Sequence, residues 1–456
     1  MGYNVCMKIT ESIFKAYDIR GISGTELTAD VALAVARAVA DYLPTDGPVV
    51  VGRDMRTDSA ELAEAVILGL TRQGRDVWDI GLVTTDMVYF SAGRFEELAG
   101  GVMVTASHNP GKYNGIKLCG RGAVPMGATN GLLDIKQAVV SDTYKASDRI
   151  GKVEQRSIVN EWVEQTLTFV NLPALEASRI AVDAGNGMAG AIFPALEEKL
   201  PFSVDRLYFE LDGTFPNHVA NPHLTETLVD ICKLIDEKKL DFGLAFDGDG
   251  DRGGIIDELG VPVPEPIMGA ILAEHFLKLQ PGATILYDVR TSHIVKDTIE
   301  AAGGKAVRSK VGGDAIKGMM RELDAVLAIE LSGHYYFKDN YFSDSGLIAV
   351  MAIVSVLAES GKKLSELVIP YQKYATAEEQ NFKVEDAKAK VLQLKVAYSD
   401  GTQDELDGLT VDYPGWWFNV RMSNTEPLVR LNVEADTEAV LQEKLAELTR
   451  IIESKE

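Results

Sequence analysis

The same order of strand, loop and helix occurs three times along the chain, and this repetition constrains the fold more than any other feature. An apolar segment at 48–51 is followed by a polar loop and by an apolar-periodic helix that begins at Ser59. A second unit follows the apolar residues 180–182, and a third contains residues 287–291, which echo the sequence of residues 53–57. The pattern predicts three related α/β domains in tandem.

The last part of the chain has a different pattern. After about residue 370, a charged connector leads to a strand, a turn and a second strand at 410–433, and an amphipathic helix follows at 437–454. This order predicts a smaller C-terminal α+β domain. A chain of 456 residues is also too long for a single hydrophobic core. We therefore predict four domains, with the boundaries 1–150, 151–254, 255–369 and 370–456.

The composition excludes several classes of partner. The formal net charge of -23 at pH 7 disfavours nucleic acids and anionic membranes, because both are bound through surplus Lys and Arg. No segment has the roughly 18 consecutive apolar residues of a membrane span, and the N-terminus shows neither an export signal nor a lipid-anchor motif. Cysteine occurs only at Cys6, Cys119 and Cys232, without the spacing of a disulfide framework or a zinc site. We expect a soluble, cytoplasmic protein whose partners are small molecules.

A serine-containing loop is the first cluster that could carry chemistry. Residues 105–110 follow an apolar strand and contain Ser107, His108 and Asn109. A serine hydroxyl becomes a good nucleophile only when a base or a metal activates it, and His108 and the later Lys117 are candidate proton-handling partners. We predict an exposed loop with Ser107 as its reactive group. The alternative is an ordinary turn, because Ser and Asn are common turn residues before a proline.

An acidic loop follows an apolar strand in the second unit. Asp247, Asp249 and Asp251 stand at alternate positions with glycines between them, so the three carboxylates can converge on one hard cation such as Mg²⁺ or Ca²⁺. An EF-hand is an alternative, since Glu258 fits its last ligand position, but Arg252 stands where that loop needs glycine. A solvated acidic turn is a further alternative. Three unpaired carboxylates so close together would, however, repel one another without a cation.

The third cluster lies after the apolar stretch at 325–329. It contains Glu330, Ser332 and His334 on one loop. These side chains offer the mixed acceptors and donors that bind sugar hydroxyls. A plain surface loop is equally consistent with this segment alone.

The fourth cluster lies between two strands near the C-terminus. Arg421, Ser423, Asn424 and Thr425 offer a cation, two hydroxyls and an amide, which together suit a phosphate group. Arg430 would add a second cation on the same face of the following strand. The alternative is a polar hairpin turn.

A glycine-rich segment introduces a competing hypothesis. Residues 185–190 match the G-x-G-x-x-G pattern of a dinucleotide-binding fold, and Asp205 stands near the distance expected for its ribose-binding carboxylate. However, Asp205 does not stand at the end of a clear second strand, and no hydride-transfer site is nearby. A glycine-rich turn that opens the second α/β unit explains the same residues.

Taken together, the four clusters resemble the motifs of the α-D-phosphohexomutase superfamily, specifically its bacterial phosphomannomutase/phosphoglucomutase branch. The resemblance begins at residues 14–21, continues through the Ser107, Asp247 and Glu330 loops in the family's order, and ends at residues 423–427. It implies four domains, three of them α/β with mixed sheets, arranged in a heart shape around a central cleft. Each domain would contribute one of the loops to that cleft.

The resemblance also implies roles for individual residues. Phosphorylated Ser107 would carry the phosphoryl group and hold Mg²⁺ together with Asp247, Asp249 and Asp251. The Glu330 loop would bind sugar hydroxyls. The loop of Arg421, Ser423, Asn424 and Thr425 would bind the phosphate that is not transferred, assisted by Arg430. Further residues match family positions at the reacting end: Tyr17, Arg20, His108, Lys117 and His334.

The implied reaction interconverts hexose 6-phosphate and hexose 1-phosphate, with mannose and glucose as the expected sugars. Phospho-Ser107 gives its phosphoryl group to the free hydroxyl, and the resulting hexose 1,6-bisphosphate, also the expected activator, turns round and returns its other phosphate. Arg20, Lys117 and Arg252 could supply positive charge, and Lys117 is the candidate general acid or base. We expect the domain beyond Pro370 to close as a lid, and the protein to be a monomer or a weak homodimer.

Two positions depart from the family pattern. Gly313 stands where many relatives carry histidine, and Ile329 stands where relatives often have glycine. These differences concern the sugar preference and not the type of reaction. Phosphoglucosamine mutase is the alternative enzyme, although that branch usually has glycine at the position of Asn424. The alternative of another class is a non-catalytic sugar-phosphate binding protein on the same fold, against which the intact Ser107 and aspartates argue.

Overall fold

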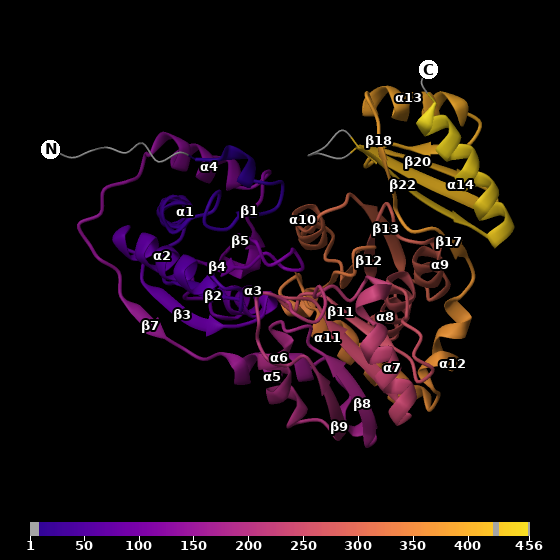
Figure 1. Cartoon of the computed structure of the whole chain (residues 1–456), viewed down its shortest axis with the longest axis horizontal. Coiled ribbons are helices and arrows are strands. Elements are labelled where there is room, and N and C mark those ends of the chain that lie inside the picture. The colour runs from indigo at the N-terminus through magenta and orange to yellow at the C-terminus, as the bar shows by residue number, and fades with distance from the viewer. Residues whose placement is uncertain (1–8, 423–427, 455–456) are drawn as a thin grey trace.

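The computed structural model describes residues 9–422 and 428–454. Figure 1 shows four successive parts of the chain: an indigo to purple part on the left, a magenta part below, a brown to orange part on the right, and a yellow part at the upper right. Each part is built around its own β-sheet. The predicted fold, three α/β domains and a smaller C-terminal domain, is confirmed.

The first two domains contain the following elements. In the first, the strands are β1 (Ile19–Ile22), β2 (Val49–Arg53), β3 (Val77–Leu82), β4 (Gly100–Val104), β5 (Tyr113–Gly120), β6 (Val124–Pro125) and β7 (Val153–Gln155). Its helices are α1 (Ala29–Tyr42), α2 (Ser59–Arg72), α3 (Thr85–Arg94) and α4 (Leu132–Ser141). In the second, the strands are β8 (Ser178–Asp183), β9 (Phe202–Leu207), β10 (Phe242–Phe246) and β11 (Gly253–Ile256). Its helices are α5 (Val159–Leu167), α6 (Ala189–Glu197) and α7 (Val229–Lys238).

The last two domains contain the remaining elements. In the third, the strands are β12 (Thr284–Asp288), β13 (Lys305–Ser309), β14 (Leu327–Ile329), β15 (Tyr335–Phe337) and β16 (Ser343–Asp344). Its helices are α8 (Glu265–Leu279), α9 (His293–Ala301), α10 (Gly313–Leu323), α11 (Gly346–Ser360) and α12 (Leu364–Val368). In the fourth, the strands are β17 (Ala375–Thr376), β18 (Gln380–Lys383), β19 (Thr402–Asp404), β20 (Leu409–Tyr413), β21 (Trp416–Met422) and β22 (Leu428–Ala435). Its helices are α13 (Ala387–Ala397) and α14 (Glu438–Glu453).

The first three sheets share one four-stranded topology. In the first sheet β2 lies between β3 and β4 and is parallel to both, and β5 pairs antiparallel with β4. The second sheet repeats this arrangement with β8 between β9 and β10, and β11 antiparallel to β10. The third repeats it with β12 between β13 and β14, and β15 antiparallel to β14. The three domains are therefore repeats of one unit, as the sequence pattern predicts.

This shared topology positions three of the four predicted site loops. The loop of Ser107 joins β4 to β5, the loop of Asp247 joins β10 to β11, and the loop of Glu330 joins β14 to β15. Each is thus the same connection of the repeated unit, at the C-terminal end of a parallel strand. In α/β sheets ligands bind beyond the carboxyl ends of the strands. The repeat places three equivalent edges together at the centre of the molecule.

Each repeat also carries an aspartate at the end of its central strand. Asp54 follows β2, and Asp183 and Asp288 end β8 and β12. In each case Oδ1 accepts a hydrogen bond from the backbone N–H two residues further on, at 3.0, 2.8 and 2.7 Å respectively. Arg56 and Arg290 pair with the first and the third aspartate at 3.2 and 2.6 Å. The sequence echo between residues 53–57 and 287–291 therefore reflects one conserved local geometry within the chain.

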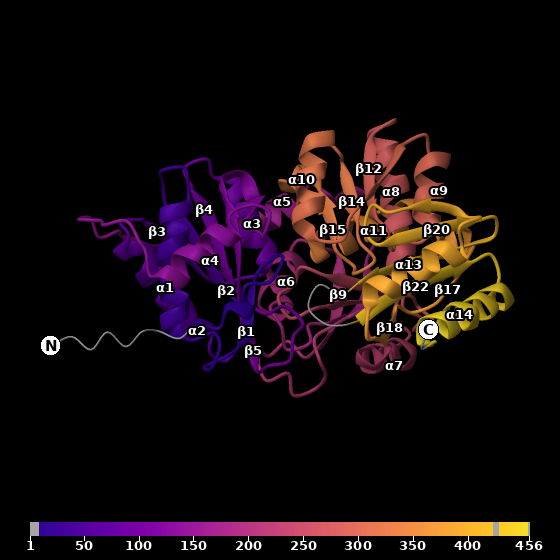
Figure 2. The ribbon, with the colours of Figure 1, turned by 90° about the horizontal axis from the view of Figure 1, so that it is seen from above.

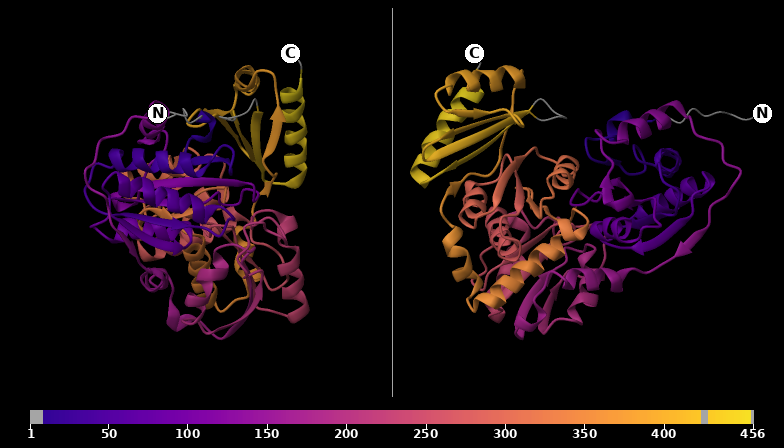
Figure 3. Two further views of the ribbon diagram at one scale, coloured as in Figure 1. Left: turned by 60° about the vertical axis from the view of Figure 1, so that its left-hand side comes forward. Right: turned by 180° about the vertical axis from the view of Figure 1, so that it is seen from behind.

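The first three domains share one large hydrophobic core, whereas the fourth domain has a core of its own. Along β2, Val49 and Val51 belong to a core that α1 and α2 cover, whereas Val50 faces a larger core shared with the second and third sheets. The fourth domain has its own core between its sheet and the helices α13 and α14. Figures 2 and 3 show that it lies beside the third domain and is reached through the connector after α12.

The contacts between the third and fourth domains include several polar pairs. His293 Nε2 lies 3.1 Å from Asp412 Oδ1, and Arg308 Nη1 lies 3.2 Å from Asp404 Oδ2. Interdomain contacts of this polar kind are typical of domains that move relative to each other. Within the described ranges, no helix is long and apolar enough to span a membrane.

Candidate active site

Ser107 occupies a strained and buried position between the first two domains. It is a non-glycine residue with a φ of 50°, a conformation that costs free energy and is often found at functional sites. Its Oγ donates a hydrogen bond to Asp247 Oδ2 at 2.9 Å and lies 3.1 Å from His108 Nδ1. The prediction of an exposed loop is wrong, because the second domain covers this loop and leaves Ser107 only 4% exposed.

Arg56 binds the backbone of the serine loop. The sequence analysis did not identify it as a site residue. Its buried guanidinium group donates to the carbonyl oxygens of Ser107 and Asn109 at 2.6 Å, and to those of Pro110 and Tyr113 at 3.2 and 2.9 Å. Four hydrogen bonds from one charged donor fix the backbone around the reactive hydroxyl. The echo of residues 53–57 was the available signal.

The acidic loop is buried and compact. Asp247, Asp249 and Asp251 are at most 1% exposed, and each offers a carboxylate oxygen within 4.8 Å of the others. The interpretation as a solvated turn is therefore wrong, since the loop lies under the first domain: Thr85 Oγ1 donates to Asp249 Oδ2 at 2.5 Å. An EF-hand is also excluded, because the loop joins two strands, β10 and β11, instead of two helices.

Two carboxylate oxygens of the acidic loop have no hydrogen-bond partner among the described residues. Oδ1 of Asp249 and Oδ1 of Asp251 are buried and accept no hydrogen bond. Burial, together with the charges of Asp251 and Asp249, raises the pKa of Asp247 well above its usual value. Three clustered carboxylates with free oxygens are the ligand set that a hard divalent cation prefers, so these residues fit a metal site.

Lys117 and Arg252 are the cations that contact the acidic loop. Lys117 Nζ, on β5, lies 2.9 Å from Asp249 Oδ2 and 2.5 Å from Asp251 Oδ2. Burial alone would lower the pKa of Lys117, but these two carboxylates raise it well above its usual value. Arg252 donates to Asp247 Oδ2 from Nε and Nη2, both at 3.2 Å.

Arg20 and His108 lie at the edge of the serine loop. Arg20 Nη1 donates to Asn109 Oδ1 at 2.8 Å, and its other terminal nitrogen pairs with Asp18. Burial and the nearby charges of Arg252 and Arg20 lower the pKa of His108 to about 2. The structure thus places His108 beside the Ser107 hydroxyl and Arg20 at the neighbouring Asn109.

The Glu330 loop is held by groups of its own domain. Glu330 Oε1 accepts from the backbone N–H of Gly312 at 3.0 Å, and Oε2 accepts from the Tyr336 hydroxyl at 2.6 Å. Ser332 Oγ lies 3.0 Å from His334 Nδ1. Glu330 is 3% exposed, so a plain surface loop is excluded.

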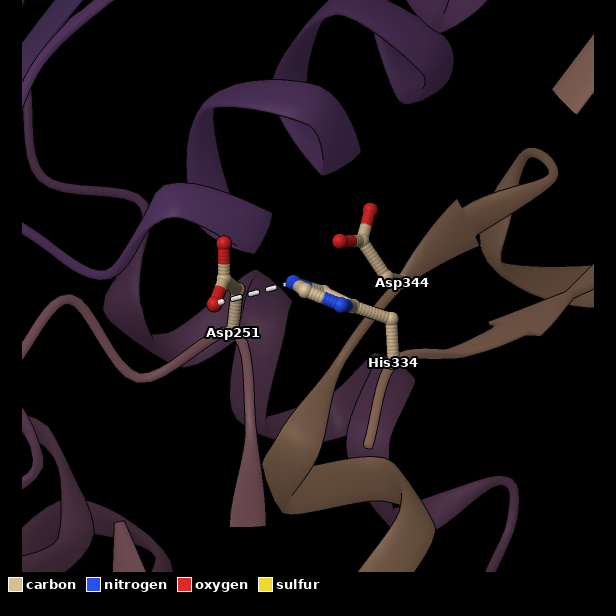
Figure 4. Close-up of side chains that lie close together, drawn as sticks. All are labelled: Asp251, His334 and Asp344. Atoms are coloured by element: carbon tan, nitrogen blue, oxygen red, sulfur yellow. Dashed lines mark ion pairs between the residues drawn. The ribbon is translucent and has the colours of Figure 1, made fainter. Parts of the chain in front are cut away.

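His334 links the third loop to the acidic loop. Figure 4 shows its imidazole between the carboxylates of Asp251 and Asp344, with the three side chains pointing toward one another. His334 Nε2 lies 3.7 Å from Asp251 Oδ1, and Lys317 Nζ holds Asp344 at 2.7 Å. The second and third domains therefore meet at this histidine.

Tyr17 reaches from the first domain to the third. Its hydroxyl donates to the carbonyl oxygen of Val311 at 3.1 Å, and its ring lies against Gly312, where a Cβ would meet the ring at 2.4 Å. The backbone N–H of Val311 donates to Asp407 of the fourth domain at 2.9 Å. The segment next to Gly313, in the third domain, is thus contacted by the first and the fourth domains.

The fourth loop is only partly within the described residues. Ser423, Asn424 and Thr425 lie outside them. Arg421 on β21 and Arg430 on β22 are direct cross-strand partners, as expected for cations on one face of the hairpin.

Arg290 is a further cation that the sequence analysis did not assign to the site. It pairs with Asp288 at 2.6 Å and lies 3.8 Å from Glu330 Oε1. Burial lowers the pKa of Arg421, and the charge of Arg290 lowers it further. Arg290 also lines a cavity of about 540 Å³ together with Ser332 and residues of the second and fourth domains. The repetition of Asp54 and Arg56 as Asp288 and Arg290 was the sequence signal that could have identified this residue.

The glycine-rich segment has a packing role. Asp205 lies within β9 and pairs with Lys238, so it does not stand at the end of that strand, as the sequence analysis expected. A Cβ on Gly187 would lie 2.8 Å from the carbonyl oxygen of Gly248 in the acidic loop. The glycines therefore allow this turn to pack closely against the acidic loop. This packing explains the glycine-rich segment without a bound dinucleotide.

Comparisons with known proteins agree with this geometry. Four models of the phosphoglucomutase/phosphomannomutase family match in order: α/β/α domain I at residues 11–142, domain II at 160–260, domain III at 266–374, and the C-terminal domain at 379–451. Fold and site together define the class of protein, the α-D-phosphohexomutases, which are phosphotransferring isomerases. The chain belongs to the phosphoglucomutase/phosphomannomutase family of hexose phosphate mutases.

Individual relatives cover nearly the whole chain. A protein named phosphohexose mutases from Xanthomonas campestris pv. campestris is 41% identical over 438 residues, which are 95% of this chain and 97% of the relative. A phosphomannomutase from Vibrio cholerae is 36% identical over 453 residues, covering 96% and 98% of the two chains. The crystal structure of a phosphoglucomutase/phosphomannomutase family protein from Burkholderia thailandensis superimposes with a TM-score of 0.90 at 32% identity and covers 98% of this chain and 99% of that one.

Proposed function

We propose that this chain interconverts the 6-phosphate and the 1-phosphate of mannose and of glucose through a phosphorylated Ser107 and a hexose 1,6-bisphosphate. The observation that carries the proposal is the hydrogen bond of 2.9 Å between Ser107 Oγ and Asp247. It joins the Ser107 hydroxyl to a cluster of three buried carboxylates. A nucleophile beside a carboxylate-lined metal site suits phosphoryl transfer.

The metal site is proposed to hold Mg²⁺ through Asp247, Asp249 and Asp251, with an oxygen of the phosphorylated Ser107 as a further ligand. When bound, Mg²⁺ would neutralise negative charge on the transferred phosphoryl group. The unpartnered carboxylate oxygens support this ligand set. A phosphate on Ser107 adds about -1.5 to -2 charges at pH 7, which the aspartates would otherwise repel.

The transfer itself requires a proton acceptor and a leaving group. The sugar hydroxyl oxygen forms a bond to phosphorus while the bond between phosphorus and Ser107 Oγ breaks, and the hydroxyl proton leaves to a side chain. Lys117 is our candidate for this general acid or base, and His108, 3.1 Å from Oγ, is a second proton-handling group. Arg20 and Arg252 would add positive charge at the reacting end.

Substrate binding is assigned to the remaining loops. Glu330, Ser332 and His334 would bind sugar hydroxyls, and Tyr17 would contact the sugar from the first domain. The other phosphate would be bound by the fourth domain through Arg421, Ser423, Asn424, Thr425 and Arg430. Because the bisphosphate must present either end to Ser107, this phosphate-binding group has to accept both phosphates in turn.

The fourth domain is proposed to close over the substrate. Its separate hydrophobic core and its polar contacts with the third domain support movement as a unit about the connector near residue 370. Closure would exclude water, which competes with the sugar hydroxyl for the phosphoryl group. We keep 370 as the start of the fourth domain, and we propose that the first two limits, predicted at 150 and 254, lie after β7 and β11, because these strands pair within the first and second sheets. A cytoplasmic monomer or weak homodimer remains our proposal for the cellular form.

A coupled assay tests the proposed substrates. The purified chain is given mannose 1-phosphate, glucose 1-phosphate or glucosamine 1-phosphate with Mg²⁺ and a catalytic amount of glucose 1,6-bisphosphate, and formation of the 6-phosphate is measured. The proposal predicts turnover of the first two sugars. Turnover of glucosamine 1-phosphate alone would instead identify a phosphoglucosamine mutase, and no turnover of any sugar would support a non-catalytic binding protein.

A further inference from the structure

A carboxylate of the fourth domain stands among the groups proposed to bind phosphate. Glu379 directly precedes β18 and faces the cross-strand pair Arg421 and Arg430. Its Oε2 accepts from Arg421 Nη2 at 3.4 Å and from Asn432 Nδ2 at 3.1 Å, and its Oε1 accepts from Arg430 Nη1 at 3.5 Å. One acidic side chain thus accepts hydrogen bonds from three side chains that could instead donate hydrogen bonds to a phosphate.

The contacts of Glu379 leave the two guanidinium groups incompletely satisfied. Both arginine hydrogen bonds are long compared with the usual 2.7–2.9 Å of a charge-assisted bond. The Nε atoms of Arg421 and Arg430 are buried and have no hydrogen-bond partner in the described part of the chain. Buried donors without partners are costly, and an oxyanion with more acceptor positions would satisfy them better.

The same carboxylate borders an open volume large enough for a ligand. Glu379 and Asn432 line the cavity of about 540 Å³ that also includes Arg290 and Ser332 from the third domain. A phosphate that entered from this cavity would meet Glu379 before it could pair fully with Arg421. Two anions cannot share these arginines without repulsion, so one of them must leave.

We propose that Glu379 is an internal substitute for the substrate's phosphate. It pairs with Arg421 and Arg430 while no phosphate is bound, and the incoming phosphate displaces it. This inference rests on the proposed phosphate-binding role of the fourth domain and adds a residue that opposes binding there. No covalent bond changes; one set of ion pairs is exchanged for another.

The exchange would help the bisphosphate to turn round. For either phosphate to reach Ser107, the other must leave the arginines once in each catalytic cycle. Without Glu379, release would leave two partly buried cations unpaired, which is energetically unfavourable. Glu379 therefore weakens phosphate binding but makes release faster, a useful exchange where release limits turnover.

Glu379→Gln tests the proposal, because glutamine keeps an oxygen for Asn432 and removes the charge. Inorganic phosphate and mannose 1-phosphate are titrated by calorimetry, and KM and kcat are measured with mannose 1-phosphate. We expect both dissociation constants and KM to fall about fivefold, the gain from freeing two partly exposed ion pairs, and kcat to fall as well. Glu385→Gln is the matched control, since Glu385 follows β18, is exposed, carries the same charge and does not line this cavity. It should change none of these values.

The contrary result is unchanged or weaker phosphate binding in Glu379→Gln, which would show that Glu379 only positions the arginines. If Glu379→Gln folds poorly, Glu379→Asp replaces it in the test. Its shorter side chain should give an intermediate gain in phosphate affinity. Arg421→Ala separates this inference from the proposed function. Normal phosphate binding by Arg421→Ala would refute the phosphate-binding role itself, whereas lost binding there without a gain in Glu379→Gln would refute only the role of Glu379.

Discussion

Ser107 Oγ and Asp247 Oδ2 form a hydrogen bond of 2.9 Å across the boundary between the first and second domains, although the residues are 140 positions apart. The pair exists because each residue occupies the same connection of a repeated α/β unit. Two repeats that pack with these edges together bring the Ser107 hydroxyl to a carboxylate cluster. The proposed reactive centre is thus a product of the repeat, and residues that fix either loop should affect catalysis.

The acidic loop should require all three carboxylates. We expect Asp249→Asn to reduce Mg²⁺-dependent kcat by about 100-fold, a typical effect of removing one charge-stabilising group. The fold should survive, because asparagine keeps an oxygen for Thr85 and relieves repulsion with Asp251. Mg²⁺ should raise the thermal midpoint of the wild type and have little effect on the variant. Asp236→Asn, at an exposed position of α7, is the control; normal turnover in Asp249→Asn would contradict the metal assignment.

Arg56 should stabilise both the fold and the reactive loop. Arg56→Lys keeps the charge beside Asp54 but cannot donate to four carbonyl oxygens at once. We expect the free energy of unfolding to fall by about 3 kcal/mol, since buried acceptors lose their partners, and kcat to fall with it. Urea unfolding and the coupled assay measure the two effects. The control Arg72→Lys lies at the exposed end of α2 and should be neutral; an equally neutral Arg56→Lys would refute the loop-fixing role.

The adjacent glycines 312 and 313 should respond differently to alanine. Gly312 has a φ of 115°, and a Cβ there would meet the Tyr17 ring at 2.4 Å. We expect Gly312→Ala to displace Tyr17 and lower kcat/KM by about 10-fold to 100-fold, as small misplacements of binding groups do. Gly313→Ala brings a Cβ no closer than 3.1 Å to the Tyr336 hydroxyl and should be much milder. Equal effects of the two variants would argue against a role for the Tyr17 contact.

Both mannose and glucose phosphates should be substrates. Glu330, Ser332 and His334 are proposed to bind hydroxyls distant from C2, so discrimination between the two sugars should stay well below about 10⁴. Gly313→His should shift the ratio of the two kcat/KM values, because it adds a side chain beside the proposed sugar-binding loop. A wild-type ratio above that limit would contradict the dual-substrate proposal.

Asp314 should make stability fall as the pH rises. Burial raises its pKa to about 6, with Lys317 opposing and Asp18 and Asp344 reinforcing the shift. The folded state therefore holds a proton that the unfolded chain loses near pH 4, so folding stability declines between about pH 4 and 6. Asp314→Asn removes this titration. The variant should gain on the order of 2 kcal/mol relative to wild type between pH 4 and pH 8. Parallel stability curves for the two proteins would rule the effect out.

Much of the fold was predictable because its signals are local. The apolar strands and the helix starting at Ser59 appear where the sequence indicates them, and so does the terminal helix, α14. The echo of Asp54 and Arg56 in Asp288 and Arg290 reports a real shared geometry. Such features depend on neighbours along the chain and are therefore readable from it.

The parts that were not predicted depend on contacts between domains. The Ser107 loop was expected to be exposed, but Ser107 and the aspartates are buried because the first two domains cover each other's loops. Arg56 and Glu379 were missed as site residues, since their importance comes from partners 42 to 57 positions away. The repetition of residues 53–57 at 287–291 was the available signal for Arg56, whereas a single sequence contains no local signal for the contacts of Glu379.

The central claim is that Ser107 carries the phosphoryl group, and intact-mass measurement tests it most directly. Purified wild-type protein is incubated with glucose 1,6-bisphosphate and Mg²⁺, then with excess mannose 1-phosphate, and its mass is recorded after each step. We predict a single phosphoryl adduct after the first step that is still present after turnover in the second, because each cycle ends with rephosphorylation of Ser107, and neither adduct nor mutase activity in Ser107→Ala. Full mutase activity in Ser107→Ala, without an adduct, would contradict the account.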